Sequence, residues 1–238
     1  LFRSELEDLL KQIKVAVSEG TVITSGIFSH LSSTGPREDL EQIARFDDAL
    51  ALATERGFEF EVRHLTASDG TLSYPQARYD MVRCGIALYG LSPFSDNKGK
   101  EFGLKPVMCA EAKVVQTKRV PAGSGGSYGY LDHTDRETTL ALVPVGYAEG
   151  LPRNATGKAE VCINGKRYPI LSRIAMDQFV VNVGDDVVQP GDEVFIFGDP
   201  AAGVPSADDL ANACDTINYE IVTRMGGRFK RHYLGSVE

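Results

Sequence analysis

An arginine and a glycine at the end of a short apolar run form the stretch of this 238-residue chain best suited to chemistry. The run reads Met81-Val82-Arg83-Cys84-Gly85-Ile86. A guanidinium at a strand end, followed by backbone N–H groups that a glycine leaves accessible, suits a phosphorylated or anionic ligand. A buried strand that ends in an exposed arginine and a turn glycine gives the same pattern. Other segments must therefore decide between the two interpretations.

Further segments with chemically useful side chains follow in a fixed order along the chain. They are Gly26–His30, Met81–Gly90, Ser127–Tyr130, Val143–Arg153, Ser172–Gln178 and Thr216–Glu220. In this order they resemble the alanine racemase family, whose enzymes use pyridoxal phosphate (PLP). The resemblance extends from about Gly26 to Tyr233.

The first ninety residues predict alternating helices and strands. Helices are expected from Ser4, as N-cap, to Ser18 and from Pro36 to about Gly57, and strands at Thr21–Phe28, Glu59–His64 and Asp80–Arg83. Such alternation is typical of a βα barrel or a doubly wound sheet. About three βα units cannot close a barrel of eight. The resemblance implies the C-terminal part of a (β/α)8 barrel, over residues 1–92, that carries the PLP phosphate side.

After a polar connector at Ser92–Gly103, the pattern changes to short strands. The expected strands are Val107–Val120, Thr138–Val145, Ala159–Ile163, Arg167–Leu171, Gln178–Val183, Glu193–Phe197 and His232–Leu234. Asn164-Gly165 predicts a two-residue hairpin turn. Short helices are expected at Ser206–Ala213 and Thr216–Met225. The predicted fold class is thus α/β followed by all-β, with residues 104–238 as a β-rich C-terminal domain carrying the partner-site tyrosine.

Composition indicates which binding partners and which cellular compartment to expect. The net charge of −8 and the absence of a dense basic block argue against nucleic acid. No apolar run is long enough for a bilayer, and no signal-peptide pattern starts the chain. Four widely spaced cysteines indicate reduced thiols, and four histidines without ligand spacing indicate no metal. We expect a cytoplasmic protein with no nucleic-acid or membrane partner.

The resemblance implies that Tyr128 carries a proton in the active site of the partner subunit, within a homodimer that shares its active sites. A phenol is a poor base unless cationic or hydrogen-bonding neighbours favour the phenolate, and His30 and Arg83 could supply these. Arg83 would face the pyridine nitrogen of PLP. A guanidinium only donates, so that nitrogen would stay unprotonated, which favours racemisation over transamination. The predicted catalytic residues are therefore Tyr128, His30 and Arg83.

The expected phosphate site consists of donors, which need no net positive protein. It combines the backbone N–H groups of Gly85 and Ile86 with the hydroxyls of Ser68 and Tyr219. With Arg83, these are the expected cofactor-binding residues. Ser68 could instead be a plain helix cap, and Asp69 would be unfavourable beside a phosphate unless it points away.

The expected substrate site uses the backbone N–H of Met176 for the carboxylate, with Tyr147 and Arg153 at the entrance. The last two could equally be a surface aromatic and a surface cation. Asp177 is expected to hold the turn, and His64 is interpreted as a structural histidine at a strand end.

The sequence departs from the family in one main respect, because the run that carries the Schiff-base lysine is absent. None of the ten lysines lies in that context: Lys11, Lys14, Lys98, Lys100, Lys105, Lys113, Lys118, Lys158, Lys166 and Lys230. The chain is interpreted as the C-terminal two-thirds of a racemase that interconverts L- and D-alanine on a PLP aldimine and supplies D-alanine for peptidoglycan. Alone, it would be inactive. The alternatives are a non-catalytic PLP-binding or dimerisation module and a related barrel-type PLP decarboxylase.

Overall fold

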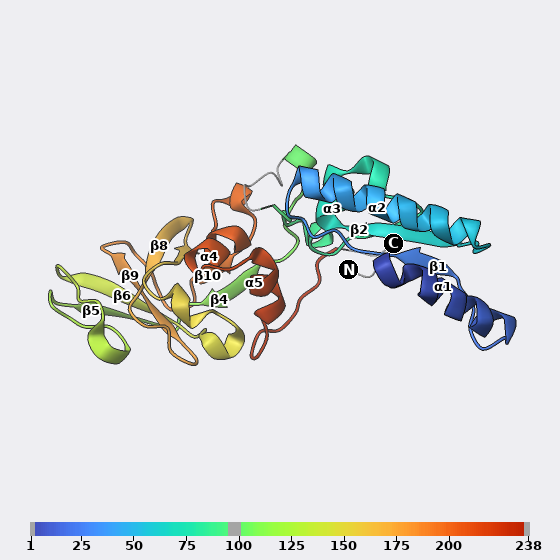
Figure 1. Ribbon diagram of the computed structural model, residues 1–238. Coiled ribbons are helices and arrows are strands. Elements are labelled where there is room, and N and C mark those ends of the chain that lie inside the picture. Colours follow the sequence, from blue (N-terminus) through green and yellow to red (C-terminus); the bar gives the residue numbers. More distant parts are fainter. Residues whose placement is uncertain (1–2, 95–100, 236–238) are drawn as a thin grey trace. The chain divides into compact units, whose positions relative to one another are not determined.

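The computed structural model describes residues 3–94 and 101–235. Its chain forms two compact units (Figure 1), which are described separately. The first contains Leu1–Leu88 and Ser92–Leu104, and the second contains Tyr89–Leu91 and Lys105–Glu238. Part of the predicted connector, residues 95–100, lies outside the described residues.

The first unit is a three-stranded parallel sheet with helices in its connections. Its elements are α1 (Arg3–Ser18), β1 (Gly26–Phe28), α2 (Pro36–Glu55), β2 (Val62–Ala67), α3 (Ser68–Ser73) and β3 (Met81–Arg83). The strand order is β1-β2-β3, with both neighbouring pairs parallel. The carboxyl ends of the strands therefore share one edge of the sheet, where α/β proteins bind ligands.

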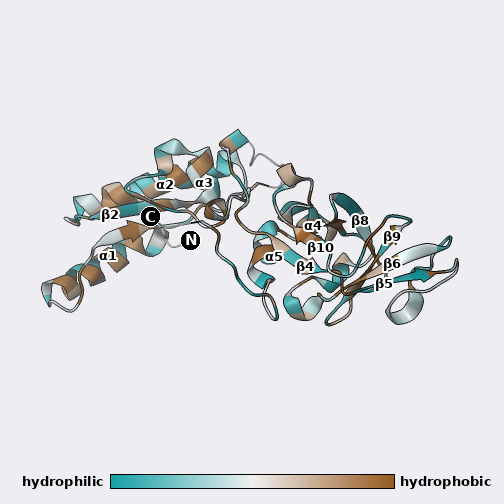
Figure 2. Cartoon of the chain, turned by 180° about the vertical axis from the view of Figure 1, so that it is seen from behind, coloured by the Kyte–Doolittle hydropathy of each residue, from teal (hydrophilic) through white to brown (hydrophobic). Residues whose placement is uncertain are grey.

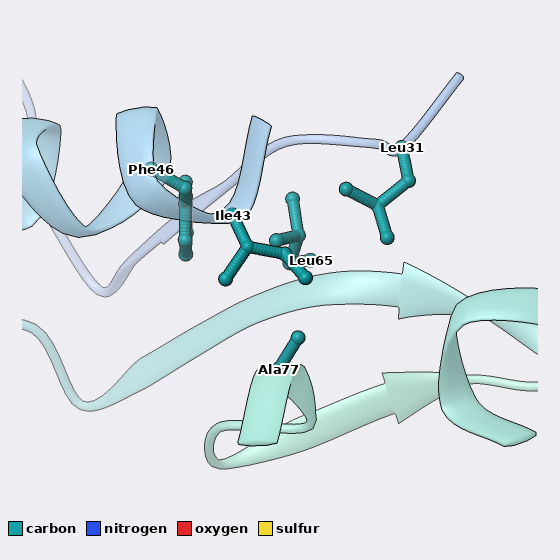
Figure 3. Close-up of a cluster of buried hydrophobic side chains, with 5 residues drawn as sticks. All are labelled: Leu31, Ile43, Phe46, Leu65 and Ala77. Atoms are coloured by element: carbon teal, nitrogen blue, oxygen red, sulfur yellow. The ribbon is translucent and has the colours of Figure 1, made fainter. Parts of the chain in front are cut away.

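A compact apolar cluster joins α2 to this sheet (Figure 3). Ile43 and Phe46 of α2 lie over Leu65 of β2, with Leu31 and Ala77 beside them, and all five are at most 6% exposed. Hydrophobic and hydrophilic residues alternate along α1 and α2 (Figure 2). The helices thus use one face for the core, as the spacing of their apolar residues predicts.

Pairing moves the strand limits away from those that sequence predicts. β1 begins at Gly26 instead of Thr21, and β2 covers Val62–Ala67 instead of Glu59–His64. The register Gly26↔Val62 starts the ladder, and just before it Ser25 O accepts the N–H groups of Glu61 and Val62 at 3.0 and 3.2 Å. α1 already includes Ser4, so the predicted N-cap at Ser4 is wrong.

The second unit is built on a seven-stranded antiparallel sheet. Its strands are β4 (Ala110–Lys113), β5 (Gln116–Val120), β6 (Thr138–Val143), β7 (Glu160–Ile163), β8 (Lys166–Leu171), β9 (Phe179–Gly184) and β10 (Glu193–Phe197), followed by α4 (Ala207–Ala213) and α5 (Asn218–Arg224). The strand order is β4-β10-β7-β8-β9-β6-β5. Together, the two units confirm the predicted α/β part followed by a β-rich part.

The sheet curls because its two end strands are consecutive in the chain. Only Val114 and Val115 separate β4 from β5, although these strands lie at opposite ends of the strand order. The N–H of Val114 donates to Asp192 O at 2.9 Å, and that of Val115 donates to Leu142 O at 3.0 Å. The single strand predicted at Val107–Val120 is therefore two, since the chain bends here to pair with β10 and then with β6. Such curling leaves few backbone groups unpaired at the edges.

Local turn and cap signals in this unit are confirmed. β7 and β8 pair through Asn164-Gly165, whose φ values of 52° and 78° suit the predicted hairpin turn. Ser206 caps α4, because its hydroxyl accepts the N–H of Asp209 at 2.9 Å. His232–Leu234 forms no strand; the described chain there is irregular.

The cysteines and histidines of the described residues form no cluster that could bind a metal ion. Cys84, Cys109, Cys162 and Cys214 are free thiols. Within residues 3–94 and 101–235, no group of three metal-binding side chains comes together. In the same ranges, no helix has the length and apolar character required to cross a bilayer.

An ion pair at the start of β3 holds it beside β2. The carboxylate of Asp80 accepts the backbone N–H of Arg63 at 2.8 Å and its guanidinium Nε–H at 2.7 Å. In return, the Asp80 N–H donates to Arg63 O at 3.1 Å. Hydrogen bonds from Arg63 lower the pKa of Asp80 from 3.8 to about 2. This Arg63–Asp80 pair, called the clamp below, helps to fix the strand register that places Arg83 at the other end of β3.

Leu65→Ala should destabilise the first unit by about 2–5 kcal/mol, because it opens a cavity under α2. Leu40→Ala is the matched control, since Leu40 lies on α2 but is 49% exposed, and its cost should stay below about 0.5 kcal/mol. Urea unfolding followed by circular dichroism measures both. Equal losses in the two variants would contradict the assigned core.

Asp80→Asn should lower stability near neutral pH, with the difference from wild type disappearing in acid. The folded-state pKa of Asp80 is depressed, so its contribution is present above the unfolded value near 4 and is lost as pH falls towards about 2. Urea unfolding at several pH values measures this difference. Asp8→Asn, which removes an exposed ion pair with Lys11, is the control. A wild-type advantage that persists at the lowest pH would contradict the clamp.

Candidate functional site

The guanidinium of Arg83 is the centre of the candidate site in the first unit. Its Nη2 donates to Ser29 O at 2.8 Å and to Leu65 O at 3.0 Å, and lies 3.0 Å from His30 Nδ1. Its Nη1 lies 2.5 Å from His64 Nδ1. The parallel register makes this convergence possible, because all of these groups lie in or just beyond neighbouring parallel strands.

Both histidines must present an unprotonated Nδ1 to Arg83, because a guanidinium has donors and no acceptor. The ring of His64 also stacks on Phe28, with centroids 5.0 Å apart, and the Arg83 guanidinium lies 5.6 Å from the Phe28 ring centroid. His64 is thus the third residue of β2 and part of the cluster, not a separate structural histidine at a strand end.

The residues after Arg83 form a small group of converging donors. The N–H groups of Gly85 and Ala87 both donate to Ser68 Oγ, at 2.9 and 3.3 Å. Ser68 is 3% exposed and is the first residue of α3, so its hydroxyl does not act as the cap considered from sequence. The carboxylate of Asp69 accepts the Ser73 hydroxyl at 3.1 Å. The structure therefore brings together Ser68 and Gly85, and Ile86 lies between the two donors.

In the second unit, Tyr128 lies on a loop with unusual backbone geometry. The flanking Ser127 and Gly129 have φ values of 55° and 76°, and the Tyr128 side chain is exposed. Ser127 Oγ donates to Arg173 O at 2.5 Å, and Asp132 accepts the Ser172 N–H at 3.0 Å. Contacts on both sides of Tyr128 thus attach the loop to the segment that precedes Met176.

Met176 and Tyr147 also come together in this unit. The Tyr147 N–H donates to Ala175 O at 3.1 Å, and the Ala148 N–H donates to Met176 O at 2.9 Å. Tyr147 and Arg153 line one open cavity of about 360 Å³, together with Arg224 of α5. Tyr219 lies on α5 as well. The predicted substrate residues therefore all lie within the second unit.

Some residues of these sites carry no sequence signal of their own. The position of His64 beside Arg83 depends on strand register. The position of Arg173 depends on its hydrogen bond with Ser127. Glu149 and Arg228 form an ion pair behind Tyr147, although 79 positions separate them. The Gly-Tyr-Ala-Glu-Gly run at 146–150 is a signal for the first of these two, but nothing local identifies its partner.

Comparison with protein families gives two consecutive matches. The model described as "Alanine racemase, N-terminal domain" matches residues 2–93. The model described as "Alanine racemase, C-terminal domain" matches residues 107–233. The two matches follow one another along the chain, and the second alone covers more than half of it.

Individual relatives agree with this result. An alanine racemase of Frankia casuarinae is 48% identical over 221 residues, which are 91% of this chain and 58% of that protein. The crystal structure of alanine racemase from Streptomyces lavendulae superposes with a TM-score of 0.95 at 44% identity, covering 99% of this chain and 63% of the other. The alanine racemase of Bartonella henselae with covalently bound pyridoxal phosphate gives a TM-score of 0.83 at 31% identity, over 98% and 62%. The chain thus spans about 60% of the length of these relatives. By sequence and by fold, this chain belongs to the alanine racemase family.

Proposed function

We propose that this chain forms the cofactor-ring, phosphate and partner-site parts of an alanine racemase that interconverts L- and D-alanine with PLP. The observation that carries the proposal is the surroundings of Arg83. The guanidinium is held by two histidines and two carbonyl oxygens. It therefore keeps its positive charge at the edge where the strands end.

The residues present fit PLP at two points. Among the described residues, Arg83 Nε has no hydrogen-bond partner, so one N–H is available to a ring nitrogen. The N–H groups of Gly85 and Ala87 converge on a single oxygen, that of Ser68, and a Cβ at Gly85 would meet nothing within 4 Å. Converging amides with open space beside them suit a phosphate oxygen.

PLP, when bound, withdraws electrons from the α-carbon of an amino acid. Arg83 donates without ever accepting a proton, so it leaves the nitrogen that it faces unprotonated and limits electron withdrawal. His30 and His64 hold the guanidinium in place. We infer that this arrangement favours return of the α-proton, and so racemisation, over competing reactions.

The proposed proton carrier on one face of the substrate is the Tyr128 Oη. Its loop is anchored through Ser127 and Asp132, which leaves the phenol exposed. We propose that it acts in the site of a second copy, in a homodimer with shared active sites. The Met176 N–H would bind the substrate carboxylate, with Tyr147 and Arg153 at the entrance and Tyr219 on the phosphate.

The second proton carrier would be a lysine from a segment that this sequence does not contain. None of the ten lysines has the family context, so we propose that activity belongs to a protein that joins this chain to such a segment. In that protein, the reaction would supply D-alanine for peptidoglycan in the cytoplasm. Without the lysine, a non-catalytic PLP-binding or dimerisation module is the second candidate, and a related PLP decarboxylase is the third.

The protein that joins this chain to the lysine-bearing segment, supplied with PLP, should convert L-alanine into D-alanine and show visible cofactor absorbance that borohydride removes and that maps to a lysine. A protein that stays colourless with PLP would favour the module.

Arg83→Glu should lower racemisation at least about tenfold and raise transamination, because a carboxylate can hold a proton on the ring nitrogen. Arg45→Glu, at an exposed ion pair on α2, is the control. A decarboxylase would tolerate the Arg83 change.

Tyr128→Phe should lower kcat for racemisation by about 10²–10⁴, the usual contribution of a positioned acid or base. The change removes a single oxygen and should leave the fold and the PLP absorbance intact. Tyr130→Phe is a matched control, since Tyr130 lies in the same loop and is 62% exposed. Measured in both directions, similar rates in the two variants would exclude Tyr128 as a proton carrier.

A further inference from the structure

Two segments of the second unit meet at one buried carboxylate, that of Glu149. Its side chain is 3% exposed. Oε1 accepts the guanidinium Nε–H of Arg228 at 2.7 Å, and Oε2 accepts the backbone N–H of Gly146 at 2.9 Å. Both oxygens of the carboxylate are thus used within the protein.

Arg228 connects this carboxylate to two further backbone segments. Its Nη2 donates to Pro144 O at 3.0 Å and to Asp177 O at 2.9 Å. The Arg228 guanidinium therefore contacts three places. They are the segment before Tyr147, the Glu149 carboxylate after it, and the turn that contains Met176. A lysine could not repeat this, because it lacks the planar fork of the guanidinium.

The backbone contacts between the loops are close and leave little freedom. Glu149 O accepts the N–H of Gly226 at 3.1 Å, which attaches the Arg228 segment directly. A Cβ at Gly146 would lie 2.3 Å from Ala175 O and from Met176 O. The loop of Tyr147 and the turn of Met176 are therefore packed backbone against backbone, with the ion pair at their side.

The pair is also constrained electrostatically. A buried carboxylate is stable only when its charge is matched and its oxygens are hydrogen-bonded. Arg228 lowers the pKa of Glu149, and the Gly146 N–H adds to this effect. Removing Arg228 would leave a buried carboxylate without its counter-charge, which would be relieved by uptake of a proton or by movement of the loops.

We propose that Glu149 and Arg228 are positioning residues, which set the Met176 N–H and the Tyr147 phenol in the geometry for substrate binding. This rests on the proposed function, in which those two groups meet the substrate. Neither residue of the pair needs to touch the substrate. Their effect should be on ground-state binding, because the same N–H serves the substrate and the transition state alike.

Arg228→Met in the PLP-loaded full-length protein should raise KM for alanine about tenfold and change kcat less than about threefold, the pattern of lost uniform binding. Amide hydrogen exchange should become faster at residues 145–150 and 175–178. The PLP absorbance should not change, because neither Glu149 nor Arg228 is among the proposed cofactor contacts. Arg228→Lys should restore part of the wild-type KM.

Arg136→Met is the matched control, because it removes an exposed arginine paired with Asp185 in the same unit, and it should keep wild-type KM and exchange. If Arg228→Met does not fold, Glu149→Gln avoids the unpaired charge and should shift KM and exchange in the same direction. Wild-type KM or unchanged exchange in the Arg228 or Glu149 variant would overturn the positioning role. A wild-type protein that does not racemise alanine would overturn the proposed function instead, and with it the substrate role.

Discussion

The hydrogen bonding of one cation, the Arg83 guanidinium, is the constraint on which the first unit depends. The guanidinium must be surrounded by acceptors, yet a carboxylate partner would neutralise it and compete with a ligand. Here the acceptors are two imidazole nitrogens and two carbonyl oxygens, and none of them is a carboxylate. The cation is therefore fixed in place while its positive charge remains. Such an environment suits a group that must donate to a neutral or anionic ligand.

This arrangement requires parallel strands in a set register. Ser29 and His30 follow β1, and His64 and Leu65 belong to β2, so their distance from Arg83 depends on how the strands are aligned. The pairing of β2 with β3 shifts between His64 and Ala67, which brings Ala67 opposite Arg83. The Arg63–Asp80 clamp lies at the far end of the same two strands. The positions of the site groups are thus set by contacts that take no part in the proposed chemistry.

The sequence predicts those parts of the fold that local rules govern. Asn164-Gly165 specifies a hairpin turn, and Ser206 specifies a helix start, because both signals act within a few residues. The role of His64 could not be predicted in this way, since it comes from strand alignment and from the stacking of its ring on Phe28. The bend at Val114-Val115 also escapes local rules. A β-rich run indicates an extended chain, but it does not say that the chain changes partners midway.

The charged side chains of the two units have opposite surroundings. This difference explains how a chain of net charge −8 can present the proposed sites for anions. In the first unit, acceptors that are not carboxylates hold a cation and leave it able to act outward. In the second, Arg228 neutralises the buried Glu149, and the group proposed to bind a carboxylate is a backbone N–H, not a charged side chain. The proposed anion recognition would depend on the placement of a few donors and not on the overall charge of the protein.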